Sequence, residues 1–147
     1  MLFTPTPQID LLTHPLFVRL TTEHQFQVLT SENFTDVAKK EGTTLLLFIE
    51  NPNRMKETMD ALVITPELVS VFPTIENKAV VIPPESRKLA IQYGFKRWPA
   101  IVLLRDGRYL GAVDGLRLWS ELLSETNTIL QSQPKYPPSI GIDVRAV

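Results

Sequence analysis

The sequence predicts an α/β protein with a mixed central sheet, helices on both faces of that sheet and a helical extension at the N-terminus. Two continuous apolar runs, 44–49 and 79–82, are typical of parallel strands that are buried on both faces. Further along, Asp106-Gly107 separates two apolar segments, which predicts an antiparallel hairpin because glycine accepts the positive φ of a tight turn. Strands alternating with helical segments complete the α/β pattern.

The predicted elements follow one another from residue 26. A strand at 26–29 leads into a helix that carries Phe34 and Val37 inward, with Ser31 as the expected N-cap and Gly42 as the expected stop. After the strand at 44–49 we expect a helix within residues 60–72, interrupted at Pro66. The strand at 79–82 and a short helix at 85–93 come next.

The last predicted elements are the hairpin strands on either side of Asp106-Gly107 and a helix that starts after Gly115. Apolar residues recur in this helix every three or four positions, which predicts that one face packs on the sheet. These residues are Leu116, Trp119, Leu122, Leu123, Ile129 and Leu130. At the other end of the chain, residues 9–20 are expected to be partly helical despite Pro15.

Length and composition predict one domain with two appendages. The chain has 147 residues, of which 44% are hydrophobic, enough for a single core. We expect an N-terminal extension at 1–24, the α/β domain at 25–131 and a disordered or extended tail at 132–147, which is rich in proline. No apolar run approaches the roughly 18 residues of a membrane helix, and residues 1–5 do not resemble a secretory signal. We therefore expect a cytoplasmic protein without stable membrane insertion.

Several kinds of chemistry lack their residues. The net charge is −1, from 15 basic and 16 acidic residues, and no basic cluster is interleaved with aromatics, so no nucleic-acid partner is expected. The chain has no cysteine, which excludes thiol–disulfide exchange. Its two histidines, His14 and His24, have no partners at metal-ligand spacing. We expect no catalytic residues, no metal and no cofactor.

Residues 94–100, Gly-Phe-Lys-Arg-Trp-Pro-Ala, followed by an apolar strand, a glycine turn and a glycine-led helix, resemble the thioredoxin fold. The resemblance implies that Trp98–Pro99 is a candidate for a cis peptide bond beside the former active site. In redox-active members, Cys-x-x-Cys follows the first buried strand at a helix N-terminus. Here the two cysteine positions fall on Asn53 and Lys56 or on Thr58 and Ala61. On the first placement, Leu47 takes the position of the buried acidic residue.

A closer resemblance spans about residues 14–130. The segments that carry it are 16–20, 52–60, 67–73, 93–100 and 109–111, together with Gly115 and Trp119. In order and spacing they look like the HyaE/HupG/HoxO family of hydrogenase accessory proteins, which is thioredoxin-like and free of cysteine. The resemblance implies a non-catalytic chaperone for the [NiFe] uptake hydrogenase small subunit, which binds the precursor and its twin-arginine signal peptide before export. A second hydrogenase accessory protein is a further candidate partner.

A signal peptide of this kind offers two arginines and an apolar stretch, so its receptor needs exposed apolar side chains and carboxylates. By the resemblance to thioredoxins, such a surface lies at the loop of residues 50–60, the segment before Pro99 and the turn at Asp114. Methionines in the loop would add adaptable apolar contacts. The candidate partner-binding residues are Glu50, Asn53, Arg54, Met55, Glu57, Asp60, Trp98, Pro99 and Asp114.

Two other functions remain open from the sequence. One is a redox-inactive thioredoxin-like interaction module in a different complex, similar to the substrate-binding domains of disulfide isomerases. The other is an enzyme that uses Lys56 or Thr58 at the former active site, for which the lysine would need a desolvated environment. Neighbouring hydrogenase structural genes would favour the chaperone over the module.

Overall fold

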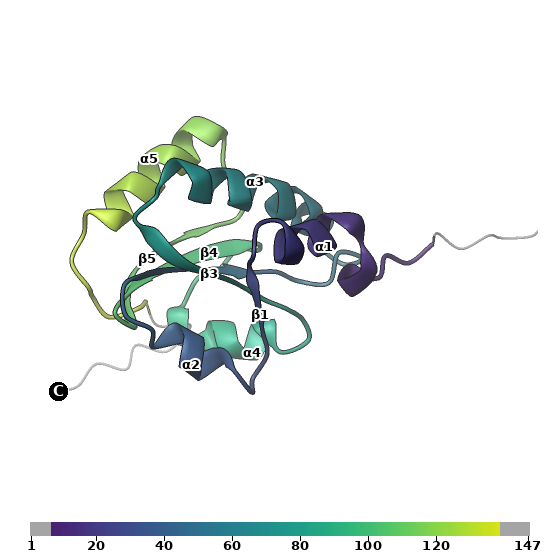
Figure 1. The fold of residues 1–147 in the computed structure, drawn as a ribbon, viewed down its shortest axis with the longest axis horizontal. Coiled ribbons are helices and arrows are strands. Elements are labelled where there is room, and N and C mark those ends of the chain that lie inside the picture. Colours follow the sequence, from purple (N-terminus) through teal and green to yellow (C-terminus); the bar gives the residue numbers. More distant parts are fainter. Residues whose placement is uncertain (1–6, 139–147) are drawn as a thin grey trace, which may run out of the picture.

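The computed structural model describes residues 7–138 (Figure 1). The helical elements are η1 (Leu11–Thr13), α1 (Pro15–Thr22), α2 (Phe34–Ala38), α3 (Glu57–Val71), α4 (Ser86–Ala90), η2 (Ile91–Tyr93) and α5 (Trp119–Leu130). The strands are β1 (Gln27–Leu29), β2 (Thr43–Phe48), β3 (Ile75–Val81), β4 (Ala100–Arg105) and β5 (Arg108–Asp114).

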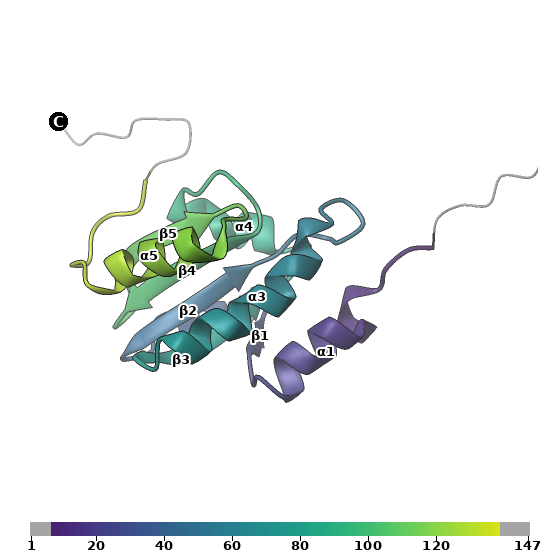
Figure 2. The same cartoon turned by 90° about the horizontal axis from the view of Figure 1, so that it is seen from above.

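The five strands form one mixed sheet in the order β1-β3-β2-β4-β5. Strand β3 pairs in parallel with both β1 and β2, whereas β4 is antiparallel to β2 and to β5. Helices α1, α3 and α5 cover one face of the sheet, and α2 and α4 cover the other (Figures 1 and 2). The predicted fold class is therefore confirmed: this is a thioredoxin-like α/β fold with an N-terminal helical extension.

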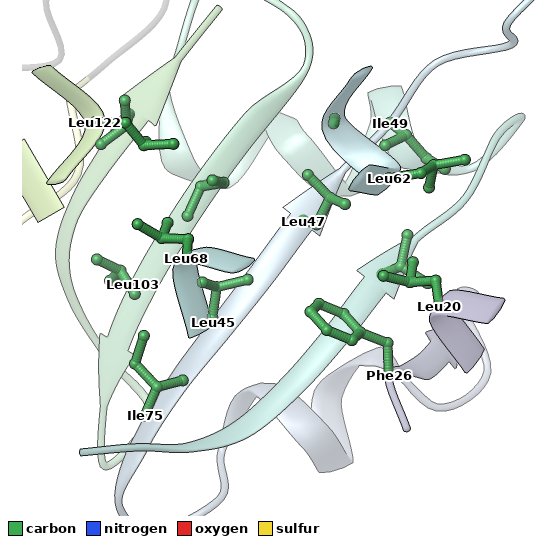
Figure 3. Packing of buried hydrophobic residues seen from close by; sticks show 14 of the residues in the cluster. Leu20, Phe26, Leu45, Leu47, Ile49, Leu62, Leu68, Ile75, Leu103 and Leu122 are labelled. Atoms are coloured by element: carbon green, nitrogen blue, oxygen red, sulfur yellow. The ribbon is translucent and has the colours of Figure 1, made fainter. Parts of the chain in front are cut away.

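The central strand β2 separates two apolar cores. Leu45 and Leu47 contribute to the core under α1, α3 and α5 (Figure 3), whereas Leu46 and Phe48 contribute to the core under α2 and α4. Successive side chains of a strand point to opposite faces, so a strand that is covered on both faces needs an unbroken apolar run. All six residues of β2 are buried, as the sequence predicts.

The N-terminal extension packs on the domain through α1. Pro15 occupies the first turn of α1, where a backbone N–H would have no hydrogen-bond acceptor within the helix, so proline costs no hydrogen bond there. The Nδ1 atom of His14 caps the helix by accepting a hydrogen bond from the Leu16 amide at 3.1 Å. Phe17 and Leu20 are buried in the same core as α3. Pro15 therefore starts this helix and does not prevent it.

The Asp106-Gly107 hairpin is confirmed, with φ values of 52° and 79° at the two turn residues. The turn also contacts Gly42. The Asp106 carboxylate accepts the Gly42 amide at 2.8 Å, and the Asp106 amide donates to the Gly42 carbonyl at 2.9 Å. The expectation that Gly42 ends the preceding helix is wrong, because that helix ends at Ala38 and Gly42 serves this contact between turns.

Two expectations about helix boundaries are also wrong. Ser31 does not cap α2, because its hydroxyl donates to the Glu85 carboxylate at 2.7 Å and Asn33 occupies the N-cap position instead. Pro66 does not interrupt α3, which runs through it for 15 residues. Proline removes one backbone hydrogen bond from the helix. The burial of Leu62 and Leu68 against the sheet stabilises α3 enough to offset this loss.

The sequence also mislocates the start of α5. Gly115 has a φ of +74° and turns the chain, and the helix starts only at Trp119. Leu116 is thus outside the helical repeat, and Leu116 and Trp119 are each 43% exposed, although the apolar spacing placed both against the sheet. Leu122, which is also in that set, is buried as expected.

Residues 132–138 have no helix or strand and lie against the edge strand β5. The Lys135 amide donates to the Tyr109 carbonyl at 2.9 Å, and Arg105 donates to the Ser132 carbonyl at 3.1 Å. The expected tail continues to residue 147, but 139–147 lie outside the described residues. The division of the chain at residues 24 and 131 stays a prediction.

Candidate functional site

Three segments meet at one end of the sheet: the loop after β2, the Trp98–Pro99 segment before β4 and the turn after β5. The Gly115 amide donates to the Pro99 carbonyl at 2.8 Å, which joins the second segment to the third. The Trp98–Pro99 peptide bond is cis, as the resemblance to thioredoxin implies. Pro99 itself is buried, so its contribution is to shape this end of the sheet.

Helix α3 starts beside these segments. Thr58 and Ala61 are in its first turns and are buried, whereas Asn53 lies in the preceding loop. Of the two placements of the thioredoxin cysteines, Thr58 and Ala61 lie inside the first turns of α3, whereas the pair Asn53 and Lys56 reaches the helix only at its N-cap, Lys56. The Thr58 hydroxyl donates to the Glu50 carbonyl at 2.9 Å, so this side chain fixes the loop after β2.

Glu50 lies two residues after the end of β2 and is 7% exposed. One of its carboxylate oxygens accepts the Asn51 amide at 2.9 Å, and the other accepts Nε of Arg87. Removing a carboxylate from water is costly unless it is paired. The pairing with Arg87 satisfies this need within the chain, so Glu50 already has a cationic partner in the free protein.

Trp98 is half-buried and packs edge-on against two rings. Its centroid lies 5.1 Å from that of Phe95 and 6.3 Å from that of Phe48. The Arg87 guanidinium carbon lies 5.1 Å from the centroid of the Trp98 ring, a distance typical of a cation–π contact. Trp98 therefore links the core under α2 and α4 to the same arginine that pairs with Glu50.

Asp114 ends β5 and holds the segment before Pro99. Its Oδ2 atom accepts the amides of Lys96 and Arg97 at 2.8 and 3.0 Å, and Arg117 lies 3.5 Å from its Oδ1. Partial burial alone would raise the pKa of Asp114, but these two amides and the charges of Arg117 and Arg97 outweigh it and hold the pKa below its ordinary value. Asp114 thus has a structural role in the free protein.

This role predicts a pH-dependent stability. At pH 7 we expect Asp114→Asn to lose about 1 kcal/mol of unfolding free energy, a value kept small because the carboxylate is only partly buried and asparagine keeps one acceptor oxygen. A depressed pKa adds stability above the unfolded pKa of about 4, and this stability is lost as the pH falls through the folded value. Urea denaturation of both proteins from pH 7 to pH 2 should show the difference shrinking below pH 4; a constant difference would refute the charge-based cause.

The other candidate residues occupy the loop before α3 and its first turn. The Asn53 side chain accepts the Ile9 amide and donates to the Ile9 carbonyl, both at 2.8 Å, so it attaches the N-terminal extension. Arg54 and Asp60 are exposed, and Met55 and Glu57 are half-buried. The structure thus brings Glu50, Trp98, Pro99 and Asp114 together, whereas the side chain of Asn53 is engaged by the extension.

Sequence reasoning missed an exposed apolar group on the face that α3 and α5 share. Leu118 is 72% exposed and Val63 is 50% exposed, and Leu116, Trp119 and Val71 are each more than 40% exposed. The exposure of Leu118 could have been predicted from the local sequence, because Glu121 three residues later can cap a helix that starts at Trp119. In the structure the Leu118 amide donates to the Glu121 carboxylate at 3.2 Å. Arg87 was also missed, because no local pattern connects it to Glu50.

Within residues 7–138, no three histidine, aspartate or glutamate side chains lie close enough together to hold a metal ion. In the same range, no helix combines the length and the apolar content that a membrane crossing requires.

Comparisons with known proteins show the family of the chain. The family model for hydrogenase-1 expression protein HyaE matches residues 16–122, which is most of the described chain. The chain belongs to the HyaE family. The matched range includes α1 from Leu16 onward, the whole sheet and the start of α5.

Individual members of the HyaE family align over nearly the full length. The chain is 33% identical over 129 residues to hydrogenase expression/formation protein HoxO of Azotobacter vinelandii, covering 88% of this chain and 86% of the relative. It is 32% identical to HoxO of Cupriavidus necator over 98% of this chain and 90% of the relative. HupG of Rhodobacter capsulatus is 30% identical over 82% of this chain and 88% of its own.

Among solved structures, a designed protein superimposes with a TM-score of 0.57, covering 73% of this chain and 94% of its own. The two share 16% sequence identity, so this likeness concerns the fold alone.

Proposed function

We propose that the protein acts in hydrogenase maturation as a non-catalytic chaperone of the [NiFe] hydrogenase small subunit. In this role it binds the small-subunit precursor and its twin-arginine signal peptide in the cytoplasm before export. Membership of the HyaE family and the names of its relatives, hydrogenase expression/formation proteins, support the coarser role. A surface on α3 and α5 supports the finer one.

That surface combines carboxylates with exposed apolar side chains. Helix α3 carries Glu57, Asp60 and Glu67, and helix α5 carries Glu121 and Glu125, whereas neither helix contains lysine or arginine. In the segment before α5, Arg117 pairs with Glu125 at 3.1 Å, so the other four carboxylates carry the acidic character of this surface. Both helices lie side by side on the same face of the sheet (Figures 1 and 2). The exposed apolar residues named above, including Val63, Leu118 and Trp119, belong to these helices or to the segment just before α5.

The chemistry of this surface suits a basic and apolar peptide. Carboxylates attract arginines over several ångströms and orient them, whereas the apolar side chains contribute affinity by losing contact with water. The segments around α2 and α4 are mixed in charge, because Lys39, Lys40, Arg87 and Lys88 lie there together with Glu32, Asp36, Glu41 and Glu85. A basic peptide is therefore expected to contact α3 and α5, because these helices carry acidic residues and no basic ones.

The roles of Asp114 and Glu50 within the fold refine the proposal. Asp114 holds two backbone amides and Glu50 is paired with Arg87, so neither carboxylate is free in the unbound protein. Asp60 is exposed, and no side-chain hydrogen bond or ion pair engages it in the described part of the chain. Among the carboxylates predicted from the sequence, Asp60 is therefore the readiest to meet an arginine of a partner.

A genetic experiment tests the function. Deleting the gene in its own host is expected to lower the activity of the uptake hydrogenase and to leave less mature small subunit, because the unprotected precursor is exported or degraded before it is complete. A plasmid copy of the gene should restore both. Unchanged hydrogenase activity in the deletion strain would contradict the proposal and favour an interaction module that serves another complex.

A further inference from the structure

Arg87 makes two contacts, an ion pair and a cation–π contact, that an arginine of a partner could also make. Its Nε donates to the Glu50 carboxylate, and its guanidinium lies over the Trp98 ring at 5.1 Å. The Arg87 side chain is nevertheless 61% exposed, whereas that of Glu50 is 9% exposed. A buried carboxylate and an aromatic face thus hold a guanidinium that is still largely in solvent.

We propose that Glu50 and Trp98 form an arginine-binding site, which Arg87 fills in the free protein and which an arginine of the partner fills in the complex. This inference rests on the proposed function, because it supplies the twin-arginine segment as the incoming ligand. Arg87 then acts as an internal competitor that the correct partner displaces.

The two walls of this site are fixed by contacts that do not involve Arg87. The Asn51 amide donates to the Glu50 carboxylate, and the Glu50 carbonyl accepts the Thr58 hydroxyl. Trp98 is held edge-on by Phe95 and Phe48. Because both walls stay in position when Arg87 leaves, the site is preorganised for a second guanidinium.

Arg87 itself is the mobile part of the arrangement. It belongs to α4, a helix of five residues, and its side chain is long and mostly exposed. Rotation of this side chain into solvent breaks one ion pair and one cation–π contact, and an incoming arginine forms both again. The charge at Glu50 is therefore never left unpaired at the end of the exchange.

There is room beside the site for a further side chain. A hollow of about 320 Å³ adjoins Arg87 and Trp98 and is lined by Ala90, Ile91, Phe95 and Lys96. Ile91 is 65% exposed and offers an apolar contact to the methylene groups of an arginine.

The first test uses Arg87→Ala and methylguanidinium as the probe. We expect the variant to unfold at a lower temperature than the native chain, and millimolar methylguanidinium to restore a large part of that loss. Trp98 fluorescence, read in a Trp119→Phe background, should shift with the same concentration dependence. In the double variant Arg87→Ala, Glu50→Gln, methylguanidinium should neither raise the unfolding temperature nor shift the Trp98 fluorescence. Equal responses of the two variants, or no response in either, would overturn the proposed site.

The second test compares two synthetic signal peptides, one with the arginine pair and one with lysines in its place. Removing an internal competitor raises the apparent affinity, so Arg87→Ala is expected to bind the arginine peptide about tenfold more tightly than the native chain does. The lysine peptide should gain less, because it lacks the planar group that stacks on Trp98. An affinity of Arg87→Ala for the arginine peptide that equals or falls below the native value would overturn the inference.

The two levels of the proposal fail in different ways. If the native chain binds the precursor with an affinity that does not change in Arg87→Ala, the exchange at Glu50 is wrong and the chaperone function stands. If the native chain binds no precursor, the chaperone function fails, and the methylguanidinium experiment still decides whether Glu50 and Trp98 form a guanidinium site.

Discussion

Phe48→Ala is expected to lose about 3–5 kcal/mol of unfolding free energy, the range for truncating a large aromatic side chain in a well-packed core. Phe48 has no exposed surface and lies at the centre of an aromatic cluster. Its ring centroid lies 5.3 Å from that of Phe95, 5.8 Å from Tyr93 and 6.3 Å from both Phe34 and Trp98. These rings come from α2, η2 and the segment before the cis proline, so several elements would have to move together to close the cavity.

Urea denaturation measures this effect, and Ile91→Ala is the matched control. Ile91 lies on the same side of the sheet but is 65% exposed, so its truncation should change stability by less than about 0.5 kcal/mol. A loss below about 1 kcal/mol for Phe48→Ala would show that the aromatic cluster is not the core of this face. Since Phe48 supports Trp98, the truncation should also broaden the Trp98 emission.

Neutralising three carboxylates on the face of α3 and α5 is expected to weaken precursor binding about tenfold. The variant is Asp60→Asn, Glu67→Gln and Glu121→Gln, which keeps the size of each side chain and the capping acceptor at Glu121. Each exposed ion pair with the partner contributes about 0.2–1 kcal/mol, so three together approach the 1.4 kcal/mol of a tenfold change. The loss should be larger at low salt, where screening is weak.

The control neutralises three exposed carboxylates elsewhere, Glu32→Gln, Asp36→Asn and Glu41→Gln, in the segments around α2. Both triple variants have the same net charge, so a general electrostatic effect would weaken binding equally in the two. Calorimetric titration of the precursor distinguishes the outcomes. Equal affinities of the two variants would mean that the partner does not bind at α3 and α5.

The sheet was predictable because its signals are local. The unbroken apolar run of β2 and the Asp106-Gly107 turn each need only neighbouring residues to be recognised, and both form as predicted. The errors arise where distant contacts compete with local preferences. Ser31 has the chemistry of a helix cap, but the carboxylate 54 residues away takes its hydroxyl. Gly42 has the chemistry of a helix stop, but it contacts the hairpin turn 64 residues away.

The candidate site shows the same limit more clearly. Glu50, Trp98 and Asp114 were predicted as candidate partner-binding residues, and the structure shows that each already has a partner within the chain. Their partners, Arg87 and the amides of Lys96 and Arg97, lie 11–37 residues away and carry no local signal. The exposure of Trp119 has a local cause. Gly115 turns the chain, and α5 starts only at Trp119, so the apolar repeat that was counted from Gly115 is about one turn out of register.

We propose that this cysteine-free thioredoxin-like protein recognises the hydrogenase small-subunit precursor through its signal peptide. Calorimetric titration of the native chain with the precursor, with and without its twin-arginine signal peptide, measures this recognition. We expect saturable binding that requires the signal peptide and weakens with salt. Equal binding of the two forms, or no binding of either, would contradict it.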